Sequence, residues 1–182
     1  MTWYYYKNND EVVFSQELPI GVEQYITRDT MVPIPAQKDG YELKLMIDFQ
    51  ANQVWYDYSL TTQGLKNIVL KNLEKYDESS AVNDFSIQGI HLWLDLNKRT
   101  GLKLRFEAEQ AQGQEDTVLW HDGMQFPLKI QDALMMLFAI EVYASACYDN
   151  TQRHAAAISA ITEKEELAAY DFTTGYPEKL EF

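Results

Sequence analysis

The sequence predicts an α+β fold, with a small antiparallel N-terminal β-module, a linking helix, and a C-terminal domain of two β-hairpins, a long apolar helix and shorter helices. Alternation of apolar and polar side chains within the first sixty residues is typical of strands with one buried side. Beyond residue 80, short hairpin patterns are followed by apolar residues at helical spacing. We therefore expect a β-module at 1–60, a helix and linker at 61–80, and an α+β domain at 81–182.

The N-terminal module is expected to contain two hairpins. The aromatic or β-branched runs Trp3–Lys7 and Glu11–Ser15 are separated by asparagine and aspartate, which favour turns. Residues 41–49 then alternate strictly, and 54–58 would return beside them as a hairpin partner. The alternation places five apolar side chains on one face: Tyr41, Leu43, Leu45, Ile47 and Phe49. Two prolines between these hairpins interrupt regular pairing, and we identify no strand there.

The linking helix is expected to begin at Thr61 or Thr62, either of which can cap it, and to end near Tyr76. The hydrophilic stretch 77–80 has the composition of a linker. In the C-terminal domain, the pairs 85–87 with 90–94 and 117–120 with 124–127 predict hairpins, because each flanks a turn that contains glycine. A helix at 97–112 is expected between them.

The longest predicted helix covers about 129–161, with Asn150 as a candidate break. Its apolar residues cover nearly the whole circumference, so nearly the whole circumference should be buried. A domain of about 100 residues has difficulty enclosing such a helix, which favours contact with another subunit. The alternative is a central core helix enclosed by its own chain. A further helix should follow, started by a capping box between Thr162 and Glu165 and ending before Gly175 and Pro177.

The formal net charge of −13 argues against nucleic acid as a partner, because a phosphate-binding surface needs clustered lysine and arginine. The longest apolar stretch, Ala133–Cys147, is shorter than the ~20 residues of a membrane span and contains Glu141. No basic segment leads into an apolar one after Met1, so we expect no secretory signal. The sequence thus predicts synthesis in a cytoplasm and no membrane partner.

No residue pattern predicts a catalytic, cofactor or metal site. The three histidines, His91, His121 and His154, lie in different predicted elements and lack a second ligand at metal-binding spacing. Cys147 and His154 share a helix face but are separated by about 10 Å along it, too far for direct proton transfer. Glutamates at 163–166 are better explained as charges that suit a helix start. We therefore predict a non-enzymatic protein without cofactor or metal.

Contact surfaces are the remaining candidates. Aromatic residues of the N-terminal module could form an interface or a platform for sugars, although an aromatic core face is an equal alternative. Apolar side chains of the long helix could join subunits in a homo-oligomer. The candidate interface residues are Trp3, Tyr5, Trp55, Tyr56, Met135, Met136 and Tyr143.

Several segments of the second half occur in an order that resembles a known family. They are Trp93-Leu94-Asp95 with Lys98-Arg99, Leu119-Trp120, the helix 139–148 with Thr151, His154 and 155–157, and the closing residues 169–177. In this combination, residues 84–182 resemble a phage tail- or fibre-associated domain of unknown function. Gly175 and Pro177 should fix a turn in the closing segment, and its aromatic side chains should hold the tail against the helices.

The resemblance implies an α+β domain in virion proteins and brings no catalytic residue with it. We therefore expect a bacteriophage virion structural or accessory protein, associated with the tail, tail fibre or head fibre, made in the bacterial host cytoplasm. Its partners would be other phage structural proteins and further copies of itself. Two alternatives stay open: a tail-fibre assembly chaperone that leaves the particle, and a carbohydrate-binding module of a receptor-binding apparatus.

Overall fold

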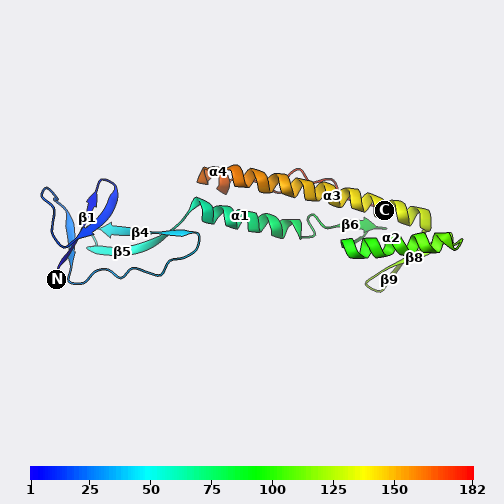
Figure 1. Cartoon of the computed structure of the whole chain (residues 1–182), viewed down its shortest axis with the longest axis horizontal. Helices are drawn as coiled ribbons and strands as arrows, with labels where there is room; N and C mark the ends of the chain where they lie inside the picture. The colour runs from blue at the N-terminus through cyan, green and yellow to red at the C-terminus, as the bar shows by residue number, and fades with distance from the viewer. The chain divides into compact units, whose positions relative to one another are not determined.

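The computed structural model describes residues 1–182 and combines helices with small antiparallel sheets, which confirms the predicted α+β class (Figure 1). The chain divides into two compact units. Unit 1 comprises Met1–Ile68 with Thr162–Lys164, and unit 2 comprises Val69–Ile161 with Glu165–Phe182. The boundary falls inside the linking helix, whereas the sequence suggested a separate helix-and-linker segment at 61–80.

Unit 1 begins with a three-stranded antiparallel sheet in the order β2-β1-β3. The strands are β1 (Trp3–Asn8), β2 (Glu11–Ser15) and β3 (Tyr25–Arg28). Tyr5 pairs with Ile26 across β1 and β3, and both side chains are buried. The β1–β2 hairpin was predicted, but β3 was not. Its four residues carry only one side chain that the unit buries, so no alternation is long enough to detect.

The second hairpin of unit 1 joins β4 (Tyr41–Asp48) to β5 (Gln53–Leu60), as predicted. Along β4, half-buried and exposed residues alternate strictly. The Asp48 side chain accepts hydrogen bonds from the backbone N–H groups of Gln50 and Ala51, both at 2.9 Å, which closes the turn. The apolar face of β4 is therefore real, but unit 1 covers it only in part.

Helix α1 (Thr62–Asp77) starts against the base of this hairpin through two glycines. The Thr61 N–H and hydroxyl both donate to the Gly40 carbonyl, at 2.9 and 3.0 Å. The Thr61 hydroxyl oxygen in turn accepts from the Gly64 N–H at 2.9 Å, as an N-cap does. A Cβ on Gly64 would lie 2.1 Å from the Gly40 oxygen, so this approach requires glycine.

Unit 2 contains the two predicted hairpins. They are β6 (Phe85–Ile87) with β7 (Ile90–Leu92), and β8 (Asp116–His121) with β9 (Met124–Lys129). The two turn residues of each hairpin, Gln88-Gly89 and Asp122-Gly123, all have positive φ, which suits the right-handed twist of the strands. The last residues of the chain also pair with β6, in parallel: the Ser86 N–H donates to Leu180 and the Phe182 N–H to Ser86. This isolated parallel bridge was not predicted.

Helix α2 (Leu96–Ala111) is capped by the Asp95 side chain, which accepts from the Lys98 N–H at 2.8 Å. Helix α3 (Ile130–Ala160) runs without interruption, as Figure 1 shows, so the candidate break at Asn150 is wrong. The Asn150 amide instead donates to the Thr174 carbonyl at 2.9 Å, which gives the polar side chain a partner outside the helix.

Helix α4 (Lys164–Ala168) is short, and its predicted capping box is also wrong. The Thr162 hydroxyl lies 3.3 Å from the Glu163 carboxylate and donates to it.

The main hydrophobic core lies in unit 2, between both hairpins, α2 and α3. Its buried members are Phe85, Ile87, Leu92, Leu94, Phe106, Leu119, Phe126, Ile130, Ala133, Met136, Leu137 and Ile140. A second cluster of Val82, Tyr143 and Cys147 continues it along α3. One face of α3 is therefore buried in the core of unit 2.

Candidate functional site: the outer stripe of the long helix

The face of α3 that points away from this core carries exposed apolar side chains in regular order. Met135, Phe138 and Val142 are 71%, 52% and 72% exposed. Their spacing of three and then four residues places them on one line along the helix, as in the contact positions of a coiled coil. The same spacing continues with Ser145, Asp149, Gln152 and Ala156, and each of these four residues is exposed. We call the row from Met135 to Ala156 the outer stripe.

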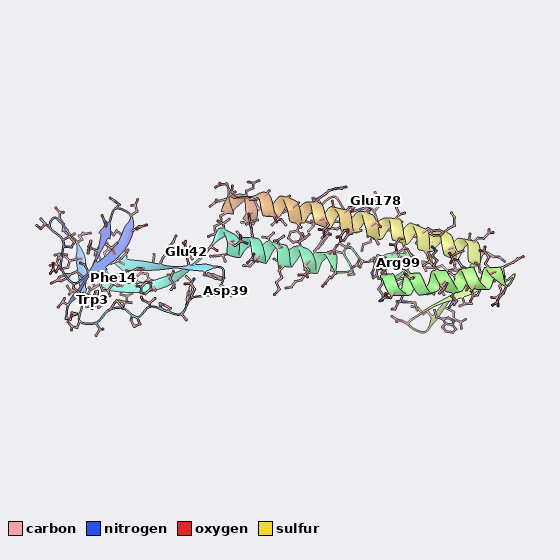
Figure 2. The ribbon with its side chains drawn as sticks, in the orientation of Figure 1. Trp3, Phe14, Asp39, Glu42, Arg99 and Glu178 are labelled. Carbon is pink, nitrogen blue, oxygen red and sulfur yellow. The ribbon has the colours of Figure 1, made fainter.

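Helix α2 borders the first half of the outer stripe. The buried Arg99 projects from α2 (Figure 2), and its Nε donates to the Glu141 carboxylate of α3 at 2.9 Å. One guanidinium nitrogen also donates to the Leu94 carbonyl at 2.7 Å. One turn further along α2, the Lys103 ammonium lies 5.3 Å from the centre of the Phe138 ring, a cation–π contact. A cation therefore stands directly beside the stripe.

The opposite face of α3 is held firmly. The Tyr143 hydroxyl donates to the Val82 carbonyl at 2.7 Å, inside the core. Burial, and after it the neighbouring Cys147, raises the pKa of Tyr143 well above its usual range. The Thr151 hydroxyl donates to the Asp77 carboxylate at 2.6 Å. These buried hydrogen bonds fix the rotation of the helix and so decide which residues form the outer stripe.

The closing segment of the chain packs across α3 in the way the sequence predicted. The His154 Nε2 lies 2.9 Å from the Thr174 carbonyl, so this nitrogen carries a proton and donates. Its Nδ1 lies 2.8 Å from the Tyr170 hydroxyl, and the ring stacks on Tyr176 with centroids 6.0 Å apart. Gly175 sits at φ +77° against the Asn150 side chain. The segment therefore acts as a clamp on the middle of α3.

Each histidine has a polar neighbour, and the cysteine is buried. Both nitrogens of His154 are used by the tail, so it does not serve Cys147. The Cys147 thiol is buried, and this burial raises its pKa away from the reactive thiolate form. His91 contacts the buried Asp84 carboxylate at 2.9 Å, and His121 lies 3.4 Å from Asp122 in a turn. No three histidine, cysteine, aspartate or glutamate side chains are grouped to hold a metal ion.

The four N-terminal interface candidates differ in how much of each side chain is exposed. Trp3 is half-buried and packs edge to face on Phe14, with centroids 5.6 Å apart (Figure 2). Tyr5 is 1% exposed, and its hydroxyl accepts from the Val32 N–H at 2.7 Å, so its assignment to an interface is corrected to a core role. Tyr56 is half-buried, and burial raises its pKa, with Tyr5 as the second cause. Trp55 remains exposed.

The candidates on α3 divide in the same way. Met136 and Tyr143 are buried in unit 2, so they cannot contact another subunit, whereas Met135 is exposed. Phe138 and Val142 complete the exposed row but were not named as candidates. Their positions three and seven residues after Met135 were the available signal. The nearly all-round apolar composition concealed it, because composition does not say which face the chain covers.

By length and composition alone, α3 could also cross a membrane. The core helix of a soluble protein passes the same test. Here the packing of α3 against both hairpins and α2, with polar contacts at Asn150, Thr151 and His154, favours the core-helix explanation.

Comparison with known proteins adds no relative. The chain matches no protein-family model, no curated protein and no solved structure.

Proposed function

We propose that the chain is a non-enzymatic structural or accessory protein of a bacteriophage particle, associated with the tail, tail fibre or head fibre, and that it acts through protein–protein contacts. The outer stripe of α3 carries the assembly part of this proposal. It presents apolar side chains on a helix whose rotation the core fixes, so the free chain offers a preorganised contact surface.

The phage part of the proposal is supported by the resemblance of residues 84–182 to a phage tail- or fibre-associated domain. On this proposal, the mature protein is part of the virion and is made in the bacterial host cytoplasm. Its partners are then other structural proteins of the particle and further copies of the chain.

Mass spectrometry of purified particles tests this location. Stoichiometric presence supports a structural or accessory subunit. Absence from mature particles, together with presence on fibre proteins purified from infected cells, would favour the assembly chaperone instead. Size-exclusion chromatography with light scattering tests the contact mechanism, for which we expect oligomers that weaken on dilution. A strict monomer at ~100 μM would contradict self-assembly.

A carbohydrate-binding role has one specific feature in its favour, the exposed Trp55 beside Met46 on the hairpin of unit 1. Binding to a glycan array that disappears in Trp55→Ala would support it. Tyr58, also exposed and on the opposite face of the same strand, provides the control variant Tyr58→Ala.

A further inference from the structure

We infer that the outer stripe binds the outer stripe of a second copy in antiparallel orientation, with a two-fold axis between Val142 and Ser145. This inference rests on the proposed assembly function and specifies its interface. The charged residues beside the stripe, and their spacing along α3, indicate that a second copy of the chain binds there.

Two charged side chains on one edge of the stripe form no direct ion pair within the chain. Asp132 and Arg153 are both exposed, and neither makes a hydrogen bond or an ion pair. The nearby Lys129 attracts Asp132 only weakly, because its ammonium is paired with Asp116 at 2.8 Å. Asp132 and Arg153 are 21 residues apart, which is three heptads, so both occupy the same position of the repeat. In an antiparallel pair of helices this position faces its equivalent on the partner. The axis between Val142 and Ser145 then places Asp132 of each copy beside Arg153 of the other.

The same axis places the one charge within the stripe beside a cation. Asp149 comes opposite Phe138 of the second copy, whose ring lies under the Lys103 ammonium at 5.3 Å. Lys103 has only a distant partner in its own chain, Glu107 at 3.8 Å, and is free to turn towards the incoming carboxylate. The antiparallel register therefore forms four opposite-charge contacts in the dimer.

A parallel arrangement lacks these contacts. It brings Asp149 directly against Asp149 of the second copy, at a contact position with no cation in the row. It also leaves Asp132 and Arg153 about 30 Å apart along the helix axis. The electrostatics thus select the antiparallel pair, and the nearly uncharged stripe lets two copies of a chain with net charge −13 approach there.

Thiol cross-linking at ~100 μM separates the two orientations. Met135→Cys and Gln152→Cys are both at exposed positions, and the antiparallel axis places them opposite each other. We expect a short bismaleimide to join the two variants when they are mixed, and neither variant alone. The unsubstituted chain is the control, because its Cys147 is buried. Cross-linking of each variant to itself, without the mixed product, would overturn the antiparallel pair while leaving self-assembly intact.

A charge exchange provides the second test. Asp132→Arg or Arg153→Glu alone should raise the dimer dissociation constant about ten-fold, since each change replaces two attractions by two repulsions. Combining both changes in one chain restores opposite charges only in the antiparallel register, so dimerisation should recover. A double variant as weak as the single ones would refute the register. A wild-type chain that stays monomeric throughout would remove the self-assembly mechanism as well, whereas presence in the particle is decided separately by mass spectrometry.

Discussion

Replacing Gly64 by alanine should destabilise unit 1, although the same change normally stabilises a helix. Gly64 lies in the first turn of α1, where alanine is favoured over glycine by about 1 kcal/mol on helix propensity alone. The structure opposes this gain, because the new Cβ would lie 2.1 Å from the Gly40 oxygen and 2.7 Å from two further backbone atoms of Gly40. No side-chain rotation relieves a clash with backbone.

The size of the expected destabilisation follows from the hydrogen bonds that must break to relieve the clash. Moving the Gly40 loop away by about 1 Å breaks the two hydrogen bonds from Thr61 to the Gly40 carbonyl, which are 2.9 and 3.0 Å long. Each contributes about 0.5–1.5 kcal/mol, and a carbonyl left unpaired costs about 1–3 kcal/mol more. After subtraction of the propensity gain, we expect a net loss of about 3 kcal/mol.

Peptide-resolved native-state hydrogen exchange is the suitable assay, because it reports unit 1 separately from unit 2. We expect faster exchange in β4, β5 and the first turn of α1. Gly101→Ala is the matched control: Gly101 is also an interior helix position, but a Cβ there meets nothing within 4 Å. It should slow exchange in α2, by a stabilisation of about 1 kcal/mol. Equal stabilisation by both substitutions would refute the close contact between Gly40 and Gly64.

Two further predictions concern buried polar groups. Tyr5→Phe removes the acceptor of the Val32 N–H and should lower the free energy of unfolding by about 1 kcal/mol in urea titrations; an unchanged midpoint would contradict this hydrogen bond. Burial works to raise the pKa of Asp84, but hydrogen bonds from Lys179 and then His91 outweigh it and hold the pKa below its ordinary 3.8. A depressed pKa means that the carboxylate stabilises the fold above about pH 4 and loses this effect as the pH falls. Asp84→Asn should therefore be less stable than wild type at pH 7, with a difference that shrinks in acid; a difference independent of pH would refute the role of the charge.

Much of the fold could be predicted because local chemistry decided it. The strict alternation of β4 and the glycine-containing turns at Gln88-Gly89 and Asp122-Gly123 specify hairpins without tertiary information. The missed features, β3 and the parallel bridge at the C-terminus, are short and form only because a distant part of the chain pairs with them. Asn150 misled the prediction for the same reason, since its partner Thr174 lies 24 residues away.

The sequence predicted that the long helix carries a contact surface, but it did not predict which residues form that surface. Composition indicated that the long helix was too apolar to be covered completely, and of the three candidates named on it only Met135 is exposed. Which neighbours share its face depends on the rotation of α3, and buried contacts such as that of Tyr143 with Val82 set this rotation. Sequence alone assigns Met135 and Met136 the same status, although a step of one residue turns a side chain by about 100° and separates surface from core.

The strength of the stripe can be bounded from its exposed side chains. Full burial of a large apolar side chain contributes roughly 1.5–3 kcal/mol, so Met135, Phe138 and Val142, at 71%, 52% and 72% exposure, contribute about 1–2 kcal/mol each. Two copies together gain about 6–12 kcal/mol, against an association cost of roughly 4–15 kcal/mol. The stripe by itself therefore supports at most a weak dimer, with a dissociation constant in the micromolar range or above. A lasting place in a particle needs a second attachment in the same chain, because linked weak contacts gain affinity from effective concentration. The half-covered face of β4 in unit 1 is the surface best suited to supply it, and a chain truncated to unit 2 should then dimerise as before but fail to join the particle.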